Sequence, residues 1–299
     1  MTVKIIDPHI HLFSRKAGDY HWLKSDNPPF WSDKKIIQRD FTPHDLTLSK
    51  GMMLEGFVHI EAGFDNNKPW RELDYIEELA SENARTIAAI NLVDSPADFK
   101  IKLAKVLSYS SLVGVRHILD EQALSILSES NTQANFSQLN EIAHLIFELQ
   151  LPLAEESSNE VMSLLTKTIA DNNQLRFIIN HAGFPPRDPH GKQWKLWQKN
   201  ITALAQYPNV FIKCSGMEMI DRQYSLAWFS DVANFCLLSF SQYRTMLASN
   251  FPLCLFSKES YNAYWQDILA SNFIKQLDTK EKSALLYHNA LRIYQRTNE

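Results

Sequence analysis

The chain has 299 residues, of which 45% are hydrophobic and 21% are charged. This composition excludes a disordered or fibrous protein, and the length suits one large α/β barrel as well as two smaller domains. The 30 basic and 34 acidic residues leave a formal net charge of −4 without a long Lys/Arg run, so we expect no nucleic-acid partner.

The apolar stretches are too short to cross a membrane. A representative long one, 232–240, falls far below the roughly 20 residues that span a bilayer. The N-terminal residues MTVKIIDPHIH lack the apolar core and the cleavage site of a signal peptide. Three cysteines, Cys214, Cys236 and Cys254, form no CxxC pair and leave one odd, which disfavours a disulfide scaffold. We therefore expect a cytoplasmic protein without a membrane partner.

Apolar, often β-branched runs recur along the chain and alternate with segments of helical spacing. Most of the runs are continuous, which is the pattern of strands buried on both faces of a parallel sheet. In chain order the predicted strands are 3–6, 54–60, 86–92, 112–115, 151–154, 175–179, 210–212 and 244–248. The predicted helices cover 73–80, 96–107, 136–147, 158–171, 192–206, 223–240, 258–275 and 279–295. This alternation predicts the α/β class and a (β/α)8 TIM barrel.

A long segment, 13–46, follows the first predicted strand and is rich in proline and aromatic residues. A loop of this length in a compact domain is usually functional, and this one is expected to lie across the barrel mouth as a lid. Trp22 and Trp31 then either cover a sugar-like ring or pack the lid against the barrel. Eight glycines and no Gly/Ser-rich linker give no domain boundary, so we expect residues 1–299 to form one domain with the lid as an insertion.

The strongest local signal is Asp7-Pro8-His9-Ile10-His11, directly after the first strand. Residues i and i+2 of an extended chain point to the same side, so His9 and His11 aim two imidazoles at one place. Barrel active sites lie at this end of the strands, and imidazole either binds a metal or polarises a carbonyl. The alternative is a polar turn with two incidental histidines.

Polar residues follow other predicted strands as well. Their recurrence at successive strand ends is a stronger indication of a site than any single residue. They are His59 and Glu61, Arg116 and His117, Glu155 and Glu156, Asn180 and His181, Lys213 to Ser215, and Ser249 and Asn250.

Structural alternatives stay open for several of these residues. His117 either serves the site or pairs with a neighbouring loop. One of Glu155 and Glu156 is expected to be a solvated carboxylate at a helix start. Lys213 is either a catalytic group or the structural partner of Glu61. His144 falls on a predicted helix and is interpreted as structural.

The motifs together resemble the amidohydrolase-related family (amidohydrolase 2), in its branch of TIM-barrel, metal-dependent hydrolases and sugar-acid lactonases. The resemblance spans nearly the whole chain. It is carried by DPHIHLF, YHWLKSDNPPFW, RDFTPHDL, VHIEAG, GVRH, NHAGFP, KCSG, ASNFP and HNALRIY. It implies a hydrolytic site at the barrel mouth, in which His9, His11 and His181 bind a metal or polarise a carbonyl.

The sequence departs from the family after the eighth strand. The family's pattern there resembles G-S-D-W-P, with the aspartate as base and possible metal ligand, whereas this chain has Asn250 in ASNFP. An amide is neither basic nor charged at neutral pH, so the attraction for a divalent cation falls. We expect any zinc to be weakly bound or absent. Either Glu61 or Glu156 is the substitute base, or the lactone is reactive enough for a slower hydrolysis that the histidines assist.

The resemblance therefore implies a lactonase-type hydrolase that opens a sugar-acid or carboxylated lactone with water. Arg116, His117 and Lys213 would bind the carboxylate or hydroxyls of this small-molecule substrate. Two alternatives stay open, a ligand-binding barrel impaired by Asn250 and a decarboxylase of the same family. The sequence does not indicate an oligomeric state.

Overall fold

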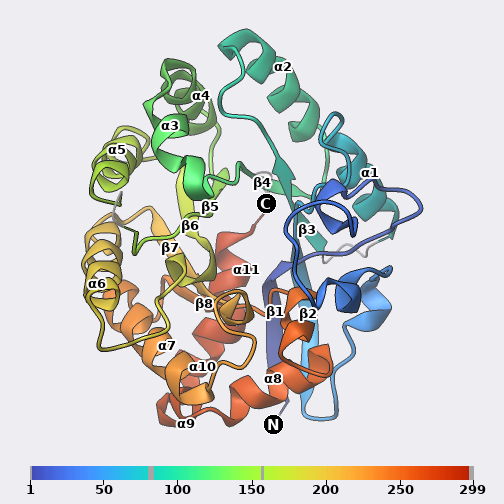
Figure 1. The fold of residues 1–299 in the computed structure, drawn as a ribbon, viewed down its shortest axis with the longest axis vertical. Helices are drawn as coiled ribbons and strands as arrows, with labels where there is room; N and C mark the ends of the chain where they lie inside the picture. The colour runs from blue at the N-terminus through green and yellow to red at the C-terminus, as the bar shows by residue number, and fades with distance from the viewer. Residues whose placement is uncertain (1, 80–83, 156–157, 296–299) are drawn as a thin grey trace.

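Eight parallel strands form one sheet in which each strand is hydrogen-bonded to its neighbours in chain order. The computed structural model describes residues 2–79, 84–155 and 158–295, and in it helices surround a barrel of strands (Figure 1). The strands are β1 (Val3–Ile10), β2 (Met52–Ile60), β3 (Ala84–Ala89), β4 (Leu112–Arg116), β5 (Ile146–Leu149), β6 (Arg176–Ile179), β7 (Val210–Cys214) and β8 (Thr245–Leu247). The predicted single-domain (β/α)8 TIM barrel is confirmed.

The barrel closes between β1 and the residues that follow β8. Ile10 and Phe251 form a parallel bridge, and the His11 amide donates to the Phe251 carbonyl at 2.6 Å. The Asn250 amide donates to the His9 carbonyl at 3.0 Å. This closure holds the residues after β8 beside the two histidines of β1, although 239 or more residues separate them in the chain.

Helices follow the strands and cover the outside of the barrel. They are α1 (Trp70–Leu79), α2 (Pro96–Leu107), α3 (Ala123–Ser128), α4 (Ser130–Asn140), α5 (Ser158–Asp171), α6 (Lys192–Ala205), α7 (Leu226–Phe240), α8 (Tyr261–Ala270), α9 (Asn272–Gln276), α10 (Thr279–Ser283) and α11 (Asn289–Ile293), with a π-helical turn at Ala284–His288. Serine side chains accept hydrogen bonds at the N-termini of several of them, for example Ser225 from the Trp228 amide. Within the three described ranges, no helix is long and apolar enough to cross a membrane.

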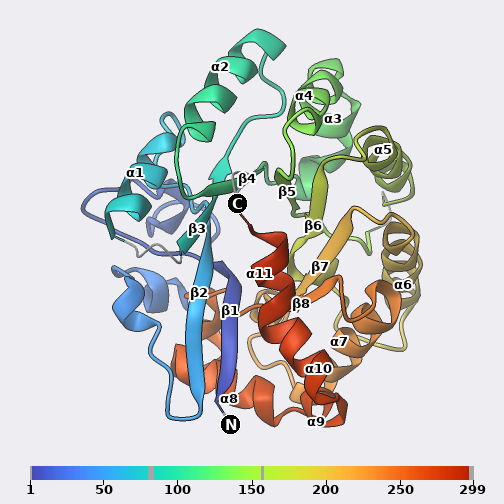
Figure 2. The same cartoon turned by 180° about the vertical axis from the view of Figure 1, so that it is seen from behind.

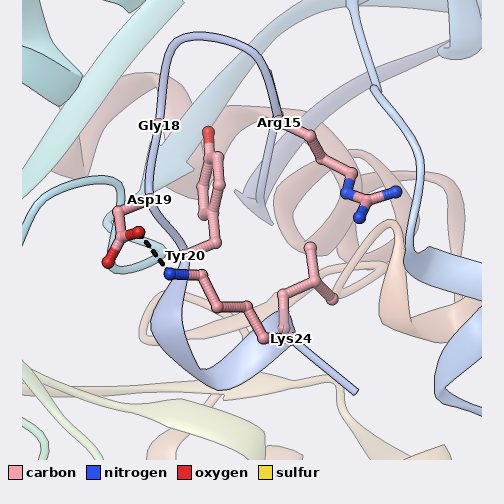
Figure 3. Close-up of a pocket in the computed structure, with 6 residues that line it drawn as sticks. Arg15, Gly18, Asp19, Tyr20 and Lys24 are labelled. Atoms are coloured by element: carbon pink, nitrogen blue, oxygen red, sulfur yellow. Dashed lines mark hydrogen bonds and ion pairs between the residues drawn. The ribbon is translucent and has the colours of Figure 1, made fainter. Parts of the chain in front are cut away.

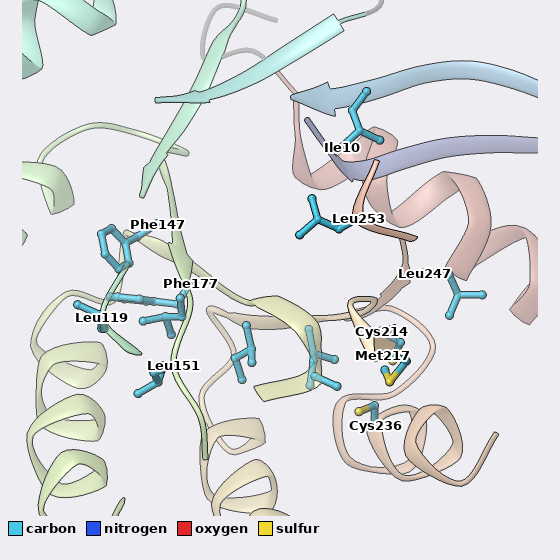
Figure 4. Close-up of a cluster of buried hydrophobic side chains, with 14 of the residues drawn as sticks. Ile10, Leu119, Phe147, Leu151, Phe177, Cys214, Met217, Cys236, Leu247 and Leu253 are labelled. Carbon is cyan, nitrogen blue, oxygen red and sulfur yellow. The ribbon is translucent and has the colours of Figure 1, made fainter. Parts of the chain in front are cut away.

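Alternate strand residues face two separate hydrophobic cores. The larger core lies between the strands and the helices, where the rings of Phe147 and Phe177 lie 6.1 Å apart (Figure 4). The smaller core fills the barrel interior and includes Ile146, Ile178 and Phe211. Residues of α11 complete this inner core, and Figure 2 shows α11 in front of the strands.

The structure corrects the prediction around the fifth strand. The predicted helix 136–147 ends at Asn140, the end of α4, and β5 occupies Ile146–Leu149 instead of 151–154. His144 is therefore not helical, and its φ of 63° places it in a turn between the two elements. Because β5 alternates, Ile146 and Glu148 face the barrel interior while Phe147 faces the helices.

The segment between β1 and β2, referred to as the lid, contains three short 3-10 helices, His21–Leu23, Lys34–Ile37 and Pro43–Asp45. The buried Lys34 ammonium donates to three backbone carbonyls of the segment, those of Trp22, Lys24 and Asn27, at 2.7–3.0 Å. A cavity of about 170 Å³ lies within the lid, beside the ion pair of Lys24 and Asp19 (Figure 3). Its lining includes none of the predicted site residues.

Candidate active site

Three buried imidazoles meet at the carboxyl ends of β1 and β6. The ring centroid of His9 lies 5.1 Å from that of His11 and 4.6 Å from that of His181. Burial lowers the pKa of each imidazole well below its usual value. The charge of Arg116 lowers all three pKa values further, and that of Lys213 lowers those of His9 and His181. All three rings are therefore neutral at physiological pH, and the structure brings together the three histidines that the sequence singled out.

A left-handed turn presents His181 to the other two histidines. His181 and Ala182 both have a φ of 52°, a conformation that is strained for residues with a side chain. The turn is held from outside by Trp197, whose Nε1 donates to the Ala182 carbonyl at 2.7 Å. Nδ1 of His181 lies 3.0 Å from the hydroxyl of Ser215 after β7. Such strain is typical of residues that are positioned for a function.

Fixed neighbours determine which nitrogen carries the proton in two of the rings. The Lys213 ammonium donates to Nδ1 of His9 at 3.0 Å, and an ammonium has no acceptor, so the ring proton of His9 sits on Nε2. Nδ1 of His11 lies 2.9 Å from the Ile60 carbonyl, which only accepts, so His11 carries its proton on Nδ1. His9 therefore offers an N–H donor, and His11 offers a lone pair on Nε2.

A buried ion pair inside the barrel, between Lys213 and Glu148, contacts His9 through Lys213. The Lys213 ammonium lies 2.6 Å from a carboxylate oxygen of Glu148 on β5, and both side chains are fully buried. Tyr294, directly after α11, donates to the other Glu148 oxygen at 2.7 Å. Burial lowers the pKa of Lys213 to about 8, although Glu148 favours the charged form. Lys213 therefore pairs with Glu148, and the alternative pairing with Glu61 is wrong.

Glu61 is instead bound by Arg116 at the ends of β2 and β4. Arg116 donates through Nε to Glu61 Oε1 at 2.8 Å and through Nη2 to the Glu61 carbonyl at 2.7 Å, and its Nη1 donates to Gln150. The second Glu61 oxygen accepts from the Gly63 amide at 3.3 Å. Both oxygens of Glu61 thus already have donors, and accepting a proton would weaken the pair with Arg116.

A cavity of about 430 Å³ opens beside this pair, between the strand ends and helices α1 and α2. Glu61, Arg116 and His117 line it together with polar residues such as Asn66 and Asn91. Nδ1 of His117 accepts from the Leu92 amide at 3.1 Å, so its proton is on Nε2. The cavity therefore presents a guanidinium and a neutral imidazole to a polar ligand.

Asn250 is paired with a carboxylate that the sequence analysis missed, Glu218 in the 3-10 helix Met217–Met219. Asn250 Nδ2 donates to Glu218 Oε1 at 2.6 Å, and both residues are 1% exposed. Burial raises the pKa of Glu218 to about 7, partly offset by the bond from Asn250. Oδ1 of Asn250 and Nε2 of His9 are both buried, and neither has a hydrogen-bond partner in the described chain.

The two lid tryptophans lie over different sides of the mouth. Trp22 donates from Nε1 to the Ala62 carbonyl at 2.7 Å, next to Glu61. Trp31 packs edge-on against Phe256 after β8, with ring centroids 5.6 Å apart, and its ring also contacts Trp22. Both tryptophans are half-buried, so they pack the lid to the barrel and still expose ring surface.

The remaining predicted residues contribute less to this cluster. His59 faces outward, where its Nε2 lies 2.8 Å from Glu72 of α1. Glu155 is exposed. Glu156 lies outside the described residues. Glu148 and Glu218, which sequence reasoning missed, are the two buried carboxylates whose partners are Lys213 and Asn250.

The side chains of this cluster do not fit a tightly bound divalent cation. Zinc needs an unprotonated nitrogen from each histidine ligand, but the contact from Lys213 leaves the proton of His9 on Nε2. Asn250 adds no negative charge, and Glu218 is engaged by its amide. The described ranges contain no group of three or more His, Cys, Asp or Glu side chains placed to hold a metal ion. The arrangement suits hydrogen bonding to a polar substrate.

Comparisons with known proteins agree with the barrel fold and identify the family. Residues 6–296 match the profile of the amidohydrolase family. The chain is 28% identical over 306 residues to the uncharacterized protein y4mH of Sinorhizobium fredii, covering 98% of both chains. It is 24% identical over 307 residues to L-fucono-1,5-lactonase of Burkholderia multivorans, covering 97% of this chain and 95% of that one.

The fold is similar to that of a solved amidohydrolase from Burkholderia multivorans with bound zinc. The TM-score is 0.78 at 20% sequence identity, over 98% of this chain and 99% of that one. Since the family profile covers nearly all of the sequence, the chain belongs to the amidohydrolase family.

Proposed function

We propose that this protein is a hydrolase that opens a sugar-acid or carboxylated lactone by attack of water, without needing a bound metal. The observation that carries the proposal is the pair of opposite tautomers in one buried cluster, a donor at His9 and a lone pair at His11. A likeness to L-fucono-1,5-lactonase over almost the full length supports the choice of a cyclic ester.

His9 is assigned to the carbonyl oxygen of the lactone. Its Nε2–H is buried and lacks a partner in the described chain, so it is free to bond the oxygen on which negative charge develops. Donors that are fixed before the reaction and shielded from water are commonly the largest catalytic contribution. Lys213 holds the ring in this tautomer and places a positive charge behind it.

His11 is assigned as the base. As water attacks the carbonyl carbon, one of its protons moves to Nε2 of His11, and the carbonyl becomes a tetrahedral oxyanion held by His9. The ring C–O bond then breaks, the carbonyl re-forms, and the leaving alkoxide takes the proton from His11. The net result is the addition of one water to give a hydroxy acid, with both histidines returned to their starting states.

Substrate polar groups are assigned to the cavity beside Glu61 and Arg116. Arg116 and His117 present hydrogen-bond donors there, which suit a carboxylate or hydroxyl groups. The half-buried rings of Trp22 and Trp31 would cover an apolar sugar face. Lys213 is too deeply buried to bind substrate directly, so its role is assigned to His9 instead.

The test is a panel of sugar-acid 1,4- and 1,5-lactones and carboxylated lactones, with acid release followed in a pH-stat. Turnover is expected for the wild type and for His190→Ala, which changes an exposed histidine, and should be lost in His181→Ala. Binding of a lactone measured by calorimetry without acid release would favour the ligand-binding barrel, which Asn250 makes the second candidate. Released carbon dioxide would instead indicate a decarboxylase.

The purified protein is expected to contain well under one zinc per chain. The reason is the ammonium against His9 and the neutral amide of Asn250, which weaken attraction for a divalent cation. Elemental analysis measures the metal content directly. Dialysis against EDTA should leave the rate unchanged, whereas stoichiometric zinc, or activity that EDTA removes and zinc restores, would contradict the assignment.

The rate should fall as the pH rises through about 8. Below that pH, Lys213 is protonated and donates to His9; above it, the neutral amine no longer fixes the His9 proton on Nε2. Profiles of kcat/KM between pH 6 and 10 measure this, with thermal unfolding at each pH as the control for an intact fold. A rate that stays constant to pH 10 would show that the Lys213 charge is not needed.

A further inference from the structure

Glu218 differs from the other buried glutamates of the site in its partner. Glu61 is paired with Arg116, and Glu148 is paired with Lys213. Glu218 makes no salt bridge within the described ranges, and its side chain accepts from the Asn250 amide. A buried carboxylate without a salt-bridge partner is unusual, because burial of a charge is ordinarily balanced by a cation.

This contact determines how the amide of Asn250 is oriented. Nδ2 of Asn250 donates to Glu218 Oε1 at 2.6 Å, so Oδ1, on the other branch of the planar amide, faces away from Glu218. Oδ1 is buried without a partner in the described chain. Buried acceptors are nearly always satisfied by protein, water or ligand, so an unpartnered one indicates a place for a donor that is not part of the chain.

The surroundings place both residues beside the histidines. The backbone amide of Asn250 donates to the His9 carbonyl, and a φ of 58° at Asn250 fixes the turn that begins there. Two residues before Glu218, Gly216 lies so close to the His181 ring that an added Cβ would sit 2.3 Å from its Nδ1. The backbone segments that carry Glu218 and Asn250, after β7 and β8, therefore lie next to His181 and His9.

Glu218 is also connected to the lid. Arg222 donates to the Glu218 carbonyl and, through Nε, to Asp33 of the lid at 2.8 Å. The guanidinium of Arg222 lies 5.3 Å from the ring centroid of Trp31 and 4.1 Å from that of Phe256. The backbone that carries Glu218 is thus held from both the barrel side and the lid side.

We propose that Glu218 is a positioning residue that orients the Asn250 amide so that Oδ1 accepts a hydrogen bond from the attacking water. This inference rests on the proposed lactone hydrolysis and adds to it a second contact for the nucleophile. Water held by Asn250 Oδ1 through one hydrogen has its other hydrogen available for Nε2 of His11. Asn250 itself takes no proton in the reaction.

Substitutions at residues 218 and 250 test this positioning role. Glu218→Gln replaces the carboxylate with an amide of the same shape, which no longer dictates the orientation of Asn250. We expect kcat to fall on the order of 100-fold while KM changes little, because misplacing a reacting group mainly slows the chemical step. Glu259→Gln, which removes an exposed carboxylate from the loop before α8, is the matched control and should keep the wild-type kcat.

Asn250→Asp alone should not restore a better enzyme, because it brings two carboxylates into the contact that now measures 2.6 Å. We expect both kcat and the melting temperature to fall. In the double variant Asn250→Asp/Glu218→Gln, the amide at 218 donates to the carboxylate at 250, so the hydrogen bond is re-formed in reverse. Its melting temperature should return toward that of the wild type. Its kcat should recover to within about ten-fold of the wild-type value, because the single changes disturb only how the two groups are oriented.

The outcomes separate this inference from the proposed function. Wild-type kcat in Glu218→Gln, or effects of the two single changes that simply multiply in the double variant, would overturn the positioning role. If the wild type opens no lactone, the proposed function fails. Thermal unfolding of the wild type, the two single variants and the double variant then tests whether the side chains at 218 and 250 form a hydrogen-bonded pair. Recovery of the melting temperature in the double variant then supports the pair, and additive losses overturn it.

Discussion

Replacing Lys213 with methionine is expected to remove most of the activity and to destabilise the fold. Lys213→Met leaves the Glu148 carboxylate in the barrel interior without its cation, and breaking a buried pair in this way costs about 3–5 kcal/mol. The rate should fall by about 10²–10³, the usual effect of losing one preorganised oxyanion donor, because His9 is no longer held with its proton on Nε2. Urea unfolding and kcat measure the two effects.

A double variant separates the two roles of Lys213. Lys213→Met/Glu148→Gln removes both charges, so most of the stability should return while the rate stays low. Lys100→Met, which changes an exposed lysine of α2, controls for the loss of one positive charge. A double variant with the wild-type rate would show that Lys213 serves only the barrel interior and that the tautomer of His9 does not depend on it.

The barrel was predictable because each buried strand leaves a local mark in the sequence. Eight continuous apolar runs, each followed by polar residues, alternate with segments of helical spacing. This pattern is visible whichever strands pair with one another in the fold. The fifth strand was misplaced because Ile146 and Phe147 continue the helical spacing of Phe136 and Leu139. The strand also contains one charged residue, Glu148, which interrupts its apolar run. Only the pairing with Lys213, 65 positions later, makes that charge acceptable inside the barrel.

The positions of the three site histidines were predictable from local patterns, but their protonation was not. Strand alternation places His9 and His11 on one side, and the barrel topology brings the end of β6 to the same rim, so the meeting of the three imidazoles follows from local patterns. Their protonation does not, because it depends on Lys213, which is 204 positions from His9, and on the Ile60 carbonyl. Asn250 alone looked like a lost base, since no local signal indicates that Glu218 contacts it.

A large loss of rate is also expected when His11 is replaced by asparagine. In His11→Asn the side-chain amide can still donate to the Ile60 carbonyl, so the local structure is kept, but no basic nitrogen remains where Nε2 was. Since general-base assistance is worth about 10²–10⁴-fold, kcat should fall by that factor with little change in thermal unfolding. Single-turnover kinetics on the preferred lactone measure it, with His190→Asn as the exposed control.

Glu61 is the competing base, and the same measurement distinguishes it from His11. If Glu61 accepts the proton, Glu61→Gln should lower kcat as much as His11→Asn does, and His11→Asn should stay within about ten-fold of the wild type. The structure favours the opposite order, because both Glu61 oxygens already accept from Arg116 and the Gly63 amide. The contact of His11 with the Ile60 carbonyl uses Nδ1, and within the described residues no hydrogen bond engages its Nε2. We therefore expect Glu61→Gln to act mainly on KM, by loosening Arg116 at the wall of the substrate cavity.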